Sequence, residues 1–299
     1  MEQALIEKLG FSSSEKVVIL HIDDMGMSHA VDVAALKCLD FGIASCGSVL
    51  VNSPWFLEIA AACRANPNYD LEVHLTLTSE YEFYRWRPLS SSDPKSGLFD
   101  DEGYLWHTAE EVVDHISPEV AEAEWRAQIQ FALANGIDVT HIDIHIQNIL
   151  NPKYFQSYLN LVSEFRVPAF LPKLSHKEIV AMGLGQHVDF YTEQINQLEA
   201  SDYPLIDHRI IEIEENKPDM TKYYCNCFSK IKPGLTHLLF HAAIMSSELT
   251  AISPDTAVCW DQNFKAFTDE RLKKCIEKYD LNIIGFRKVR DYFRRINFG

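Results

Sequence analysis

The chain has 299 residues, of which 47% are hydrophobic and 23% are charged, and its formal net charge is −16. This composition is typical of a globular protein, and the length allows one α/β barrel or two smaller domains. The negative charge opposes binding to a phosphate backbone, so we expect no nucleic-acid partner. The N-terminal stretch is not typical of a secretory signal, and no apolar run approaches the length of a bilayer span. We therefore expect no membrane partner.

Cysteine usage predicts a reduced, cytoplasmic setting. The chain has seven cysteines, an odd number, and contains no Cys-x-x-Cys pair. Cys225 and Cys227 are separated by a single residue, and we expect them to be buried or partly exposed free thiols. The other cysteines are scattered: Cys38, Cys46, Cys63, Cys259 and Cys275.

Strand and helix signals alternate through the first half of the chain. Apolar runs rich in β-branched residues predict strands at 17–22, 45–52, 71–77 and 139–146. Helix-capping side chains lie between these strands, at Ser28, Ser53, Thr108 and Ser117. The first of the capped helices is expected to end at Gly42.

The second half continues the alternation less regularly. Helices are expected at 151–165 and 261–279 and at the C-terminus, and strands at 167–171, 205–213, 235–242 and 281–284. Strands alternating with helices predict a mainly parallel sheet in one domain. An α/β barrel is favoured over an open doubly wound sheet, because no strand is followed by a glycine-rich nucleotide fingerprint.

Acidic and imidazole side chains fall at the ends of the predicted strands. Asp23 and Asp24 end the first strand, His74 lies near the end of the third, and His241 ends the strand that begins at residue 235. The fourth strand carries His145 near its end. Because active sites of parallel sheets lie at the carboxyl ends of strands, we expect these groups to meet in one site.

The Asp-Asp pair and the motif HIDIH each have a structural alternative. Adjacent residues of an extended strand point in opposite directions, so one aspartate could bind a metal while the other faces a substrate water. An Asx turn at a strand end is the alternative. His141, Asp143 and His145 share a strand face and span about 13 Å, so they cannot all bind one ion unless the strand bends. His141 and Asp143 are expected to support the site from behind or to contact substrate, and satisfied core polar residues are the alternative.

His74 completes a candidate metal site. With one aspartate of the pair and His145, it offers two imidazoles and a carboxylate and leaves coordination positions open. Such a set suits zinc, cobalt, nickel or iron(II), and magnesium and manganese stay open. His241 is expected to face the metal and to donate a proton to a leaving amine, with a packed strand-end histidine as the alternative.

Several segments together resemble the YdjC-like carbohydrate deacetylases, a family that includes chito-oligosaccharide deacetylases. The stretch VVILHIDDMGMS is followed by a helix and by SCGSVLVNSPWFLEIA, as in the opening of that family. EVHLTLT at 72–78, THIDIHIQN at 140–148 and GLTHLLFHAA at 234–243 match further motifs in the same order. The segments cover most of the chain.

The resemblance implies an irregular α/β barrel related to the polysaccharide deacetylases, formed by residues 1–299 as a single domain. It also implies one divalent ion, with magnesium and zinc as the leading candidates, bound by Asp24, His74 and His145. Asp23 matches the position of the general base, although the roles of the two aspartates could be reversed. The implied reaction removes an acetyl group from an N-acetylated sugar, and a homodimer stays an open alternative.

The chain departs from the family pattern at three positions. Ile22 replaces the alanine that often precedes the Asp pair, Gln147 stands where some members have another histidine, and Ala242 replaces a proline after His241. These departures keep the metal-binding set but bear on the preferred sugar and on the role of His241.

The long loop at 78–107 is expected to lie on the substrate side of the barrel, because structureless loops of this length are usually functional. Its side chains Tyr84, Trp86 and Arg87 could form a flat platform for a sugar ring. The alternative is an Ω-loop packed by its own side chains.

Two other functions compete with deacetylation. A non-catalytic sugar- or metal-binding protein could use the same fold, since fold does not fix function. A metal-dependent hydrolase of another amide or ester is the second, although two-metal phosphatases need more clustered carboxylates than the sequence places together. A dehydrogenase is disfavoured by the missing phosphate-binding loop.

Overall fold

The structure is a computed structural model that describes residues 4–146, 151–211 and 216–299. Within these residues, seven parallel strands form one sheet in the order β4-β3-β2-β1-β6-β5, with β7 paired to β1. The strands are β1 (Lys16–Met25), β2 (Cys46–Val49), β3 (Leu71–Leu75), β4 (Val139–Ile144), β5 (His208–Ile211), β6 (Gly234–Phe240) and β7 (Leu281–Ile283). The expected parallel α/β domain is therefore confirmed.

The sheet closes into an irregular barrel through a segment that is not itself a regular strand. Residues 167–172 lie between the two sheet edges and form isolated parallel bridges, Ile142 with Ala169 and Pro172 with Ile206. The Phe170 N–H donates to the Ile142 carbonyl at 2.8 Å, and the Ile206 N–H donates to the Leu171 carbonyl at 3.1 Å. The strand expected at 167–171 thus takes the place of a barrel strand but forms only single bridges.

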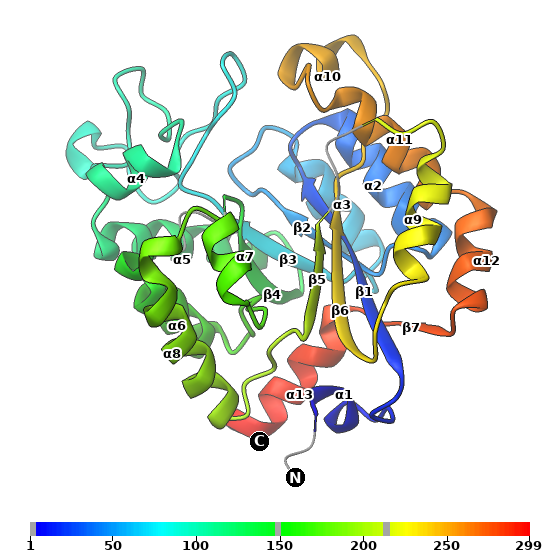
Figure 1. Ribbon diagram of the computed structural model, residues 1–299. Coiled ribbons are helices and arrows are strands. Elements are labelled where there is room, and N and C mark those ends of the chain that lie inside the picture. Colours follow the sequence, from blue (N-terminus) through cyan, green and yellow to red (C-terminus); the bar gives the residue numbers. More distant parts are fainter. Residues whose placement is uncertain (1–3, 147–150, 212–215) are drawn as a thin grey trace.

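Strand β1 is the central element of the barrel. It pairs along seven residues with β6, and on its other side it pairs first with β7 and then with β2. Figure 1 shows β1 rising through the middle of the molecule beside β6. Its last four residues lie at the end of the barrel where the long loop and α10 rise above the sheet.

Helices surround the barrel and cover both of its sides (Figure 1). The first group comprises α1 (Leu5–Lys8), α2 (His29–Phe41), α3 (Phe56–Ala65), α4 (Ala109–His115), α5 (Pro118–Ala134) and α6 (Pro152–Phe165). The second comprises α7 (His176–Ala181), α8 (Val188–Ala200), α9 (Met220–Phe228), α10 (Ser247–Ile252), α11 (Ala257–Phe267), α12 (Glu270–Lys278) and α13 (Phe286–Phe298).

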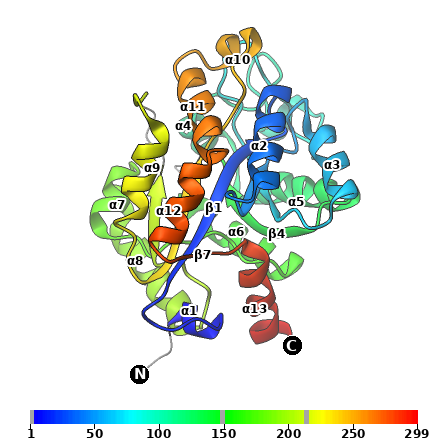
Figure 2. The same ribbon diagram turned by 90° about the vertical axis from the view of Figure 1, so that its right-hand side faces the viewer.

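The protein has two apolar cores, one between the barrel and its helices and one at the floor of the barrel, the end at which the strands begin. The outward side chains of the strands, such as Leu20 and Val73, pack against the surrounding helices. A smaller core fills the interior at the amino ends of the strands, where Val17 and Ile19 meet Phe286 of α13. Figures 1 and 2 show α1 and α13 beneath this end, opposite the end at which α10 lies.

Local capping explains several helix boundaries. Ser28 accepts from the Val31 N–H and Gly42 adopts a left-handed φ of 80°, so α2 begins and ends as expected. The capping box of Thr108 and Glu111 also forms. Ser53 does not cap α3, because its hydroxyl donates to the carbonyls of Gly26 and Leu50 instead. This turn starts α3 two residues later than Pro54 predicts.

The prediction of a single helix at 261–279 is wrong. Two helices occupy this region, because α11 ends at Phe267 and α12 begins at Glu270. Asp269 separates them by accepting from the Arg271 N–H, and an Asp at this position favours a new helix start over continuation.

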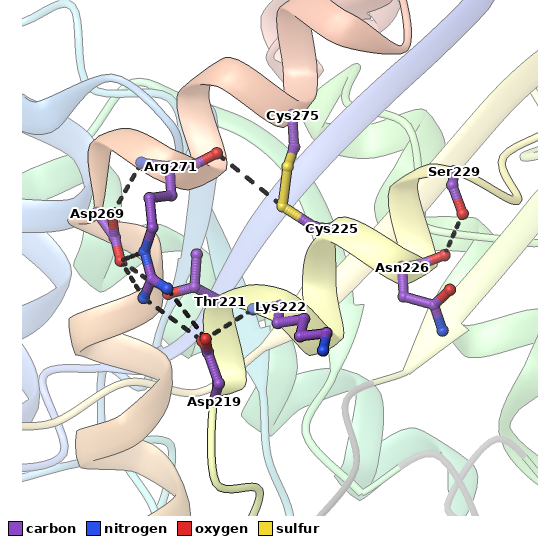
Figure 3. The surroundings of a disulfide bond; sticks show 9 residues. All are labelled: Asp219, Thr221, Lys222, Cys225, Asn226, Ser229, Asp269, Arg271 and Cys275. Atoms are coloured by element: carbon purple, nitrogen blue, oxygen red, sulfur yellow. Dashed lines mark hydrogen bonds and ion pairs between the residues drawn. A yellow bond between two sulfur atoms is a disulfide. The ribbon is translucent and has the colours of Figure 1, made fainter.

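One disulfide is present, so the expectation that Cys225 is a free thiol is wrong. Cys225 of α9 is bonded to Cys275 of α12, across 50 residues of sequence. Beside this bond Arg271 donates to Asp219 and Asp269, which gives the two helices a second connection (Figure 3). Cys227 is a free cysteine, as expected. The Cys225–Cys275 disulfide therefore does not support the reduced setting that the number of cysteines predicted.

None of the described helices combines the length and the apolar character that crossing a lipid bilayer requires.

Candidate metal centre

The Asp-Asp pair lies in a distorted turn at the end of β1. The pairing register between β1 and β2 shifts between Ile22 and Met25, and Asp24 adopts a left-handed φ of 63°. Short polar residues tolerate this conformation better than other residues with a side chain. The distortion turns both carboxylates inward, so the alternation expected for an extended strand does not hold here. Asp23 Oδ1 and Asp24 Oδ1 each lie 3.5 Å from His74 Nε2.

Three side chains converge at this turn. Asp24, His74 and His145 each offer a ligand atom, and these atoms lie within 4.8 Å of one another. His145 Nδ1 is 3.1 Å from Asp24 Oδ1. His74 comes from β3, and His145 follows the last residue of β4, so the barrel positions all three on one rim.

The donor set fits a divalent cation. Asp24 Oδ1 and both ring nitrogens of His74 are buried without a hydrogen-bond partner among the described residues. Burial and the neighbouring His145 lower the pKa of His74 to about 3, so its ring is neutral, which is the form that binds metals. Burial opposes ionisation of Asp24, but His145 and His241 outweigh it and hold the pKa of this carboxyl well below its usual range.

Glu80 is a member of the site that sequence reasoning missed. Its Oε1 lies 2.8 Å from Nε2 of His145, on the side of the ring that faces away from Asp24. Burial opposes the charged imidazole, but Glu80 and Asp24 together raise the pKa of His145 well above its usual value. A carboxylate behind a metal-binding histidine typically fixes its tautomer and orientation.

Ser48 of β2 is a second missed residue. Its hydroxyl donates to Asp23 Oδ1, and it accepts from the Asp24 N–H at 3.0 Å. One serine therefore fixes both aspartates, and it leaves Asp23 Oδ2 directed toward His241, whose Nε2 lies 3.9 Å away. The serines of the strand before Val51-Asn52 were the sequence feature from which a role for Ser48 could have been predicted.

His241 stands across the site, where the sequence placed it. Its Nε2 lies 3.4 Å from Asp24 Oδ2, and its ring stacks on Trp260 at a centroid distance of 5.1 Å. The Asn263 side chain donates to the His241 carbonyl at 2.9 Å. The histidine is thus held by α11 while its ring reaches the aspartates.

The two remaining polar residues of β4 take different positions. Asp143 lies beside His74 in the sheet register and lines the cavity of the site. Burial raises the pKa of Asp143 well above its usual range, and Asp23 adds to this effect. His141 lies deeper and is fully buried, stacked on Phe286 at 3.6 Å. It does not reach the rim.

The loop residues Tyr84, Trp86 and Arg87 are not among the residues that line the cavity. The Tyr84 hydroxyl donates to the Met27 carbonyl, and the Trp86 ring is buried with its N–H donating to the Thr78 carbonyl at 2.7 Å. Arg87 lies near the Tyr104 ring, 5.4 Å from its centroid. This arrangement fits the alternative of a loop packed by its own side chains.

A cavity of about 340 Å³ opens above the three candidate ligands. Both polar and apolar groups line it, including Tyr81, Ser253 and Trp260. Its volume lies within the ~300–1,000 Å³ that is usual for small-molecule sites. Both Asp23 and Asp24 line this cavity.

Fold and site together define an α/β-barrel protein with a candidate metal centre at the carboxyl ends of its strands. Comparison with known proteins adds the family. The model of the YdjC-like protein family matches residues 17–278, and the chain belongs to this family. The resemblance found in the sequence motifs is therefore confirmed.

Two relatives and one solved structure illustrate the similarity. A carbohydrate deacetylase of Thermus thermophilus is 32% identical over 251 residues, which cover 84% of this chain and 86% of that protein. A carbohydrate deacetylase of Vibrio vulnificus is 23% identical over 91% of this chain and 96% of its own length. A protein of Enterococcus faecalis proposed to cleave cellobiose phosphate has a TM-score of 0.75 at 21% identity, covering 92% of this chain and 99% of that one. This last likeness concerns the fold alone.

Proposed function

We propose that the protein is a divalent-metal-dependent hydrolase that removes the acetyl group from an N-acetylated sugar or chito-oligosaccharide. The main support for this proposal is the convergence of Asp24, His74 and His145 in one cavity, beside a second carboxylate, that of Asp23. Family membership and the names of two similar proteins support the choice of an acetylated carbohydrate as substrate.

Asp24, His74 and His145 would hold the ion. When bound there, a divalent ion supplies Lewis-acid polarisation of the acetamide carbonyl and lowers the pKa of water. Asp24 is favoured over Asp23 as the ligand because its Oδ1 is close to both histidines, at 3.5 Å and 3.1 Å. Magnesium and zinc are the leading candidates, and two imidazoles favour zinc.

Asp23 would act as the general base. Ser48 occupies its Oδ1 with a hydrogen bond, so Oδ2 is the oxygen available to take a proton from the attacking water. General-base catalysis needs the carboxylate within hydrogen-bond reach of that water, and Asp23 lies on the cavity wall beside the candidate ligands.

His241 would hold the proton that the leaving amine requires. Its Nε2 faces the two carboxylates, and the stacked Trp260 restricts the ring to that orientation. Trp260 also borders the cavity, where its indole offers an apolar surface for a sugar ring.

The test measures acetate release from N-acetylglucosamine oligomers by purified protein before and after removal of metal with a chelator. We expect activity to be lost on chelation and restored by added metal. Asp24→Asn should abolish metal binding, whereas Asp23→Asn should retain the metal and lower kcat by at least about a hundredfold. Asp101→Asn, an exposed loop substitution, serves as the matched control.

Activity that survives chelation or the Asp23→Asn substitution would exclude this mechanism. Metal binding without turnover of any acetylated sugar would favour the non-catalytic binding protein. Turnover of a different amide or ester would keep the metal site and change the substrate.

A further inference from the structure

A layer of buried polar side chains crosses the barrel below the candidate metal centre. His21 of β1, Glu72 of β3, His141 of β4 and His237 of β6 all have 0% exposure. They lie on the inner face, between the apolar floor around Phe286 and the rim aspartates. Barrel interiors are usually filled by branched apolar side chains, and buried polar groups are costly unless they are partnered. The proposed deacetylation uses none of these four side chains.

The hydrogen bonds around His141 define which of its nitrogens carries the proton. The Thr140 hydroxyl donates to the Leu71 carbonyl at 3.1 Å, so its oxygen must accept from Nδ1 of His141, 3.0 Å away. Nδ1 thus carries the proton of the neutral ring, which is the form that binds metals. Its Nε2 therefore presents a lone pair.

That lone pair faces a carboxylate oxygen. His141 Nε2 lies 2.7 Å from Glu72 Oε2, yet neither atom has a hydrogen-bond partner among the described residues. His21 Nε2 lies 3.7 Å from Glu72 Oε1 and is also unpartnered. Two electron-rich atoms at 2.7 Å repel each other unless a proton on Glu72 or a cation lies between them, and a metal ion that binds there displaces such a proton. Within the described parts of the chain, the ion-pair neighbours of Glu72 are the imidazoles of His21, His74 and His141, and no lysine or arginine pairs with it.

We propose that Glu72, His21 and His141 form a second, internal binding site for a divalent transition-metal ion of the zinc class. Their ligand atoms all lie within 4.8 Å of one another. Bonds of about 2.0–2.1 Å in a tetrahedral site place ligand atoms about 3.3 Å apart, and the observed 2.7 Å and 3.7 Å lie on either side of that value. Two imidazoles and one carboxylate are a suitable zinc set.

His237 and Thr140 complete the surroundings of this internal site. His21 Nδ1 lies 2.8 Å from His237 Nε2, and donation from His21 to His237 leaves His21 Nε2 free to bind the ion. In the same way, donation from His141 Nδ1 to the Thr140 hydroxyl leaves His141 Nε2 free to bind the ion. Such outer partners are typical of metal-binding histidines. His74 separates the two sites, since its Nε2 faces Asp24 and its Nδ1 lies 3.3 Å from Glu72 Oε1.

Burial predicts a distinctive exchange behaviour. Glu72, His21 and His141 have no exposed surface, whereas the rim ligands border an open cavity. An internal ion can leave only when the barrel opens, so it should resist a chelator that strips the rim site.

The experiment counts zinc in protein that was expressed with added zinc. We expect two ions per chain before treatment with EDTA, one after treatment of the folded protein, and none after unfolding in EDTA. Glu72→Gln should carry one ion that EDTA removes. Asp24→Asn, the matched variant at the rim, should carry one ion that EDTA does not remove. The glutamine amide can donate to the imidazole lone pairs, so Glu72→Gln is expected to fold, which circular dichroism checks.

Two results would overturn the internal site: folded wild-type protein with no zinc after EDTA, or Glu72→Gln that keeps an EDTA-resistant ion. If Glu72→Gln does not fold, X-ray absorption of the EDTA-treated wild type decides, since two imidazoles and a carboxylate around zinc support the site and any other ligand set overturns it. The count of two ions rests on the rim site of the proposed function, but the EDTA-resistant ion does not. None of these measurements uses acetate release, so a failure of the internal site and a failure of the proposed deacetylation are distinguishable.

Discussion

At the residue scale, His145 is held between two carboxylates that come from different parts of the chain. Asp24 Oδ1 lies 3.1 Å from its Nδ1, and Glu80 Oε1 lies 2.8 Å from its Nε2. A carboxylate on the far nitrogen makes an imidazole a better metal ligand and prevents rotation of the ring. Glu80 is therefore expected to affect metal binding through His145.

We predict that Glu80→Gln weakens metal binding by about 10–100-fold, because the amide removes the charge that orients His145. Competition with a chromogenic chelator measures the affinity. Glu82→Gln, an exposed neighbour on the same loop, should leave the affinity unchanged. Equal affinities for Glu80→Gln and the wild type would contradict this role.

Asp32 is a buried acid that links α2 to the turn after β1. Its Oδ1 accepts from the Gly26 N–H at 2.6 Å. Burial raises the pKa of Asp32 to about 8, against the opposing Gly26 hydrogen bond, and nearby Glu58 raises it further. The unfolded chain ionises this group near its ordinary value of about 3.9. The free energy of unfolding should therefore fall as pH rises from about 4 to about 8.

We predict that Asp32→Asn flattens this pH dependence. Asparagine keeps the acceptor for Gly26 and has no charge to bury, so the variant should gain stability relative to wild type as pH rises, by at most about 1.4 kcal/mol per pH unit. Urea unfolding at pH 5 and pH 7 provides the measurement, with Asp101→Asn as the exposed control. A parallel pH dependence in wild type and Asp32→Asn would refute the assignment.

At the element scale, the turn between β1 and α2 depends on Gly26. Its φ is +89°, and an added Cβ would lie 3.1 Å from the Leu50 carbonyl oxygen and 3.2 Å from the Phe56 Cα. Gly10 has a similar φ of +92° with nothing within 4 Å of the added atom. An alanine at Gly10 therefore tests only the left-handed backbone conformation, whereas an alanine at Gly26 also tests the close approach of neighbouring backbone.

We predict that Gly10→Ala lowers the free energy of unfolding by about 1–2 kcal/mol, the cost of a left-handed alanine. Gly26→Ala should cost a further ~1–3 kcal/mol, because rigid backbone must move. It should also weaken metal binding, since the turn positions Asp24. Denaturant unfolding and metal titration of both variants test this, and equal losses of stability would show that close approach is unimportant.

The first half of the fold was predictable because its elements have local signals. Buried β-branched runs and serine or threonine caps give β1, α2 and α5 close to their observed bounds. The second half was harder. The helices α7 and α8 were not predicted, although Ser175 and Glu178 form a capping box at the start of α7, and the break at Asp269 depends on one capping side chain. The barrel closure at 167–172 follows from long-range pairing that no local pattern encodes.

The site was predictable to the extent that it follows strand ends. Asp23, Asp24, His74, His145 and His241 meet as the strand-end rule requires. Glu80 was not predictable, because it reaches His145 across 65 residues from a loop. The inward turn of Asp24 was also missed, since an alternating strand places neighbouring carboxylates on opposite faces.

At the scale of the whole molecule, the Cys225–Cys275 disulfide closes a loop that contains β6, α10 and α11. Closing a loop of 50 residues restricts the unfolded chain, which stabilises the native state by about 2–4 kcal/mol. We predict that reduction, or Cys225→Ser with Cys275→Ser, lowers the free energy of unfolding by this amount. Cys227→Ser should have little effect. Equal stability of oxidised and reduced protein would contradict the prediction.

The central position of β1 has a consequence for biosynthesis. This strand, Lys16–Met25, leaves the ribosome well before its partners β6 and β7, which end at Phe240 and Ile283. At ~5–20 residues per second, translation leaves one side of β1 unpaired for roughly 10–40 s. An apolar strand that waits this long is a target for aggregation and for chaperones. The nascent chain, more than the finished barrel, is therefore the form in which this protein is most vulnerable.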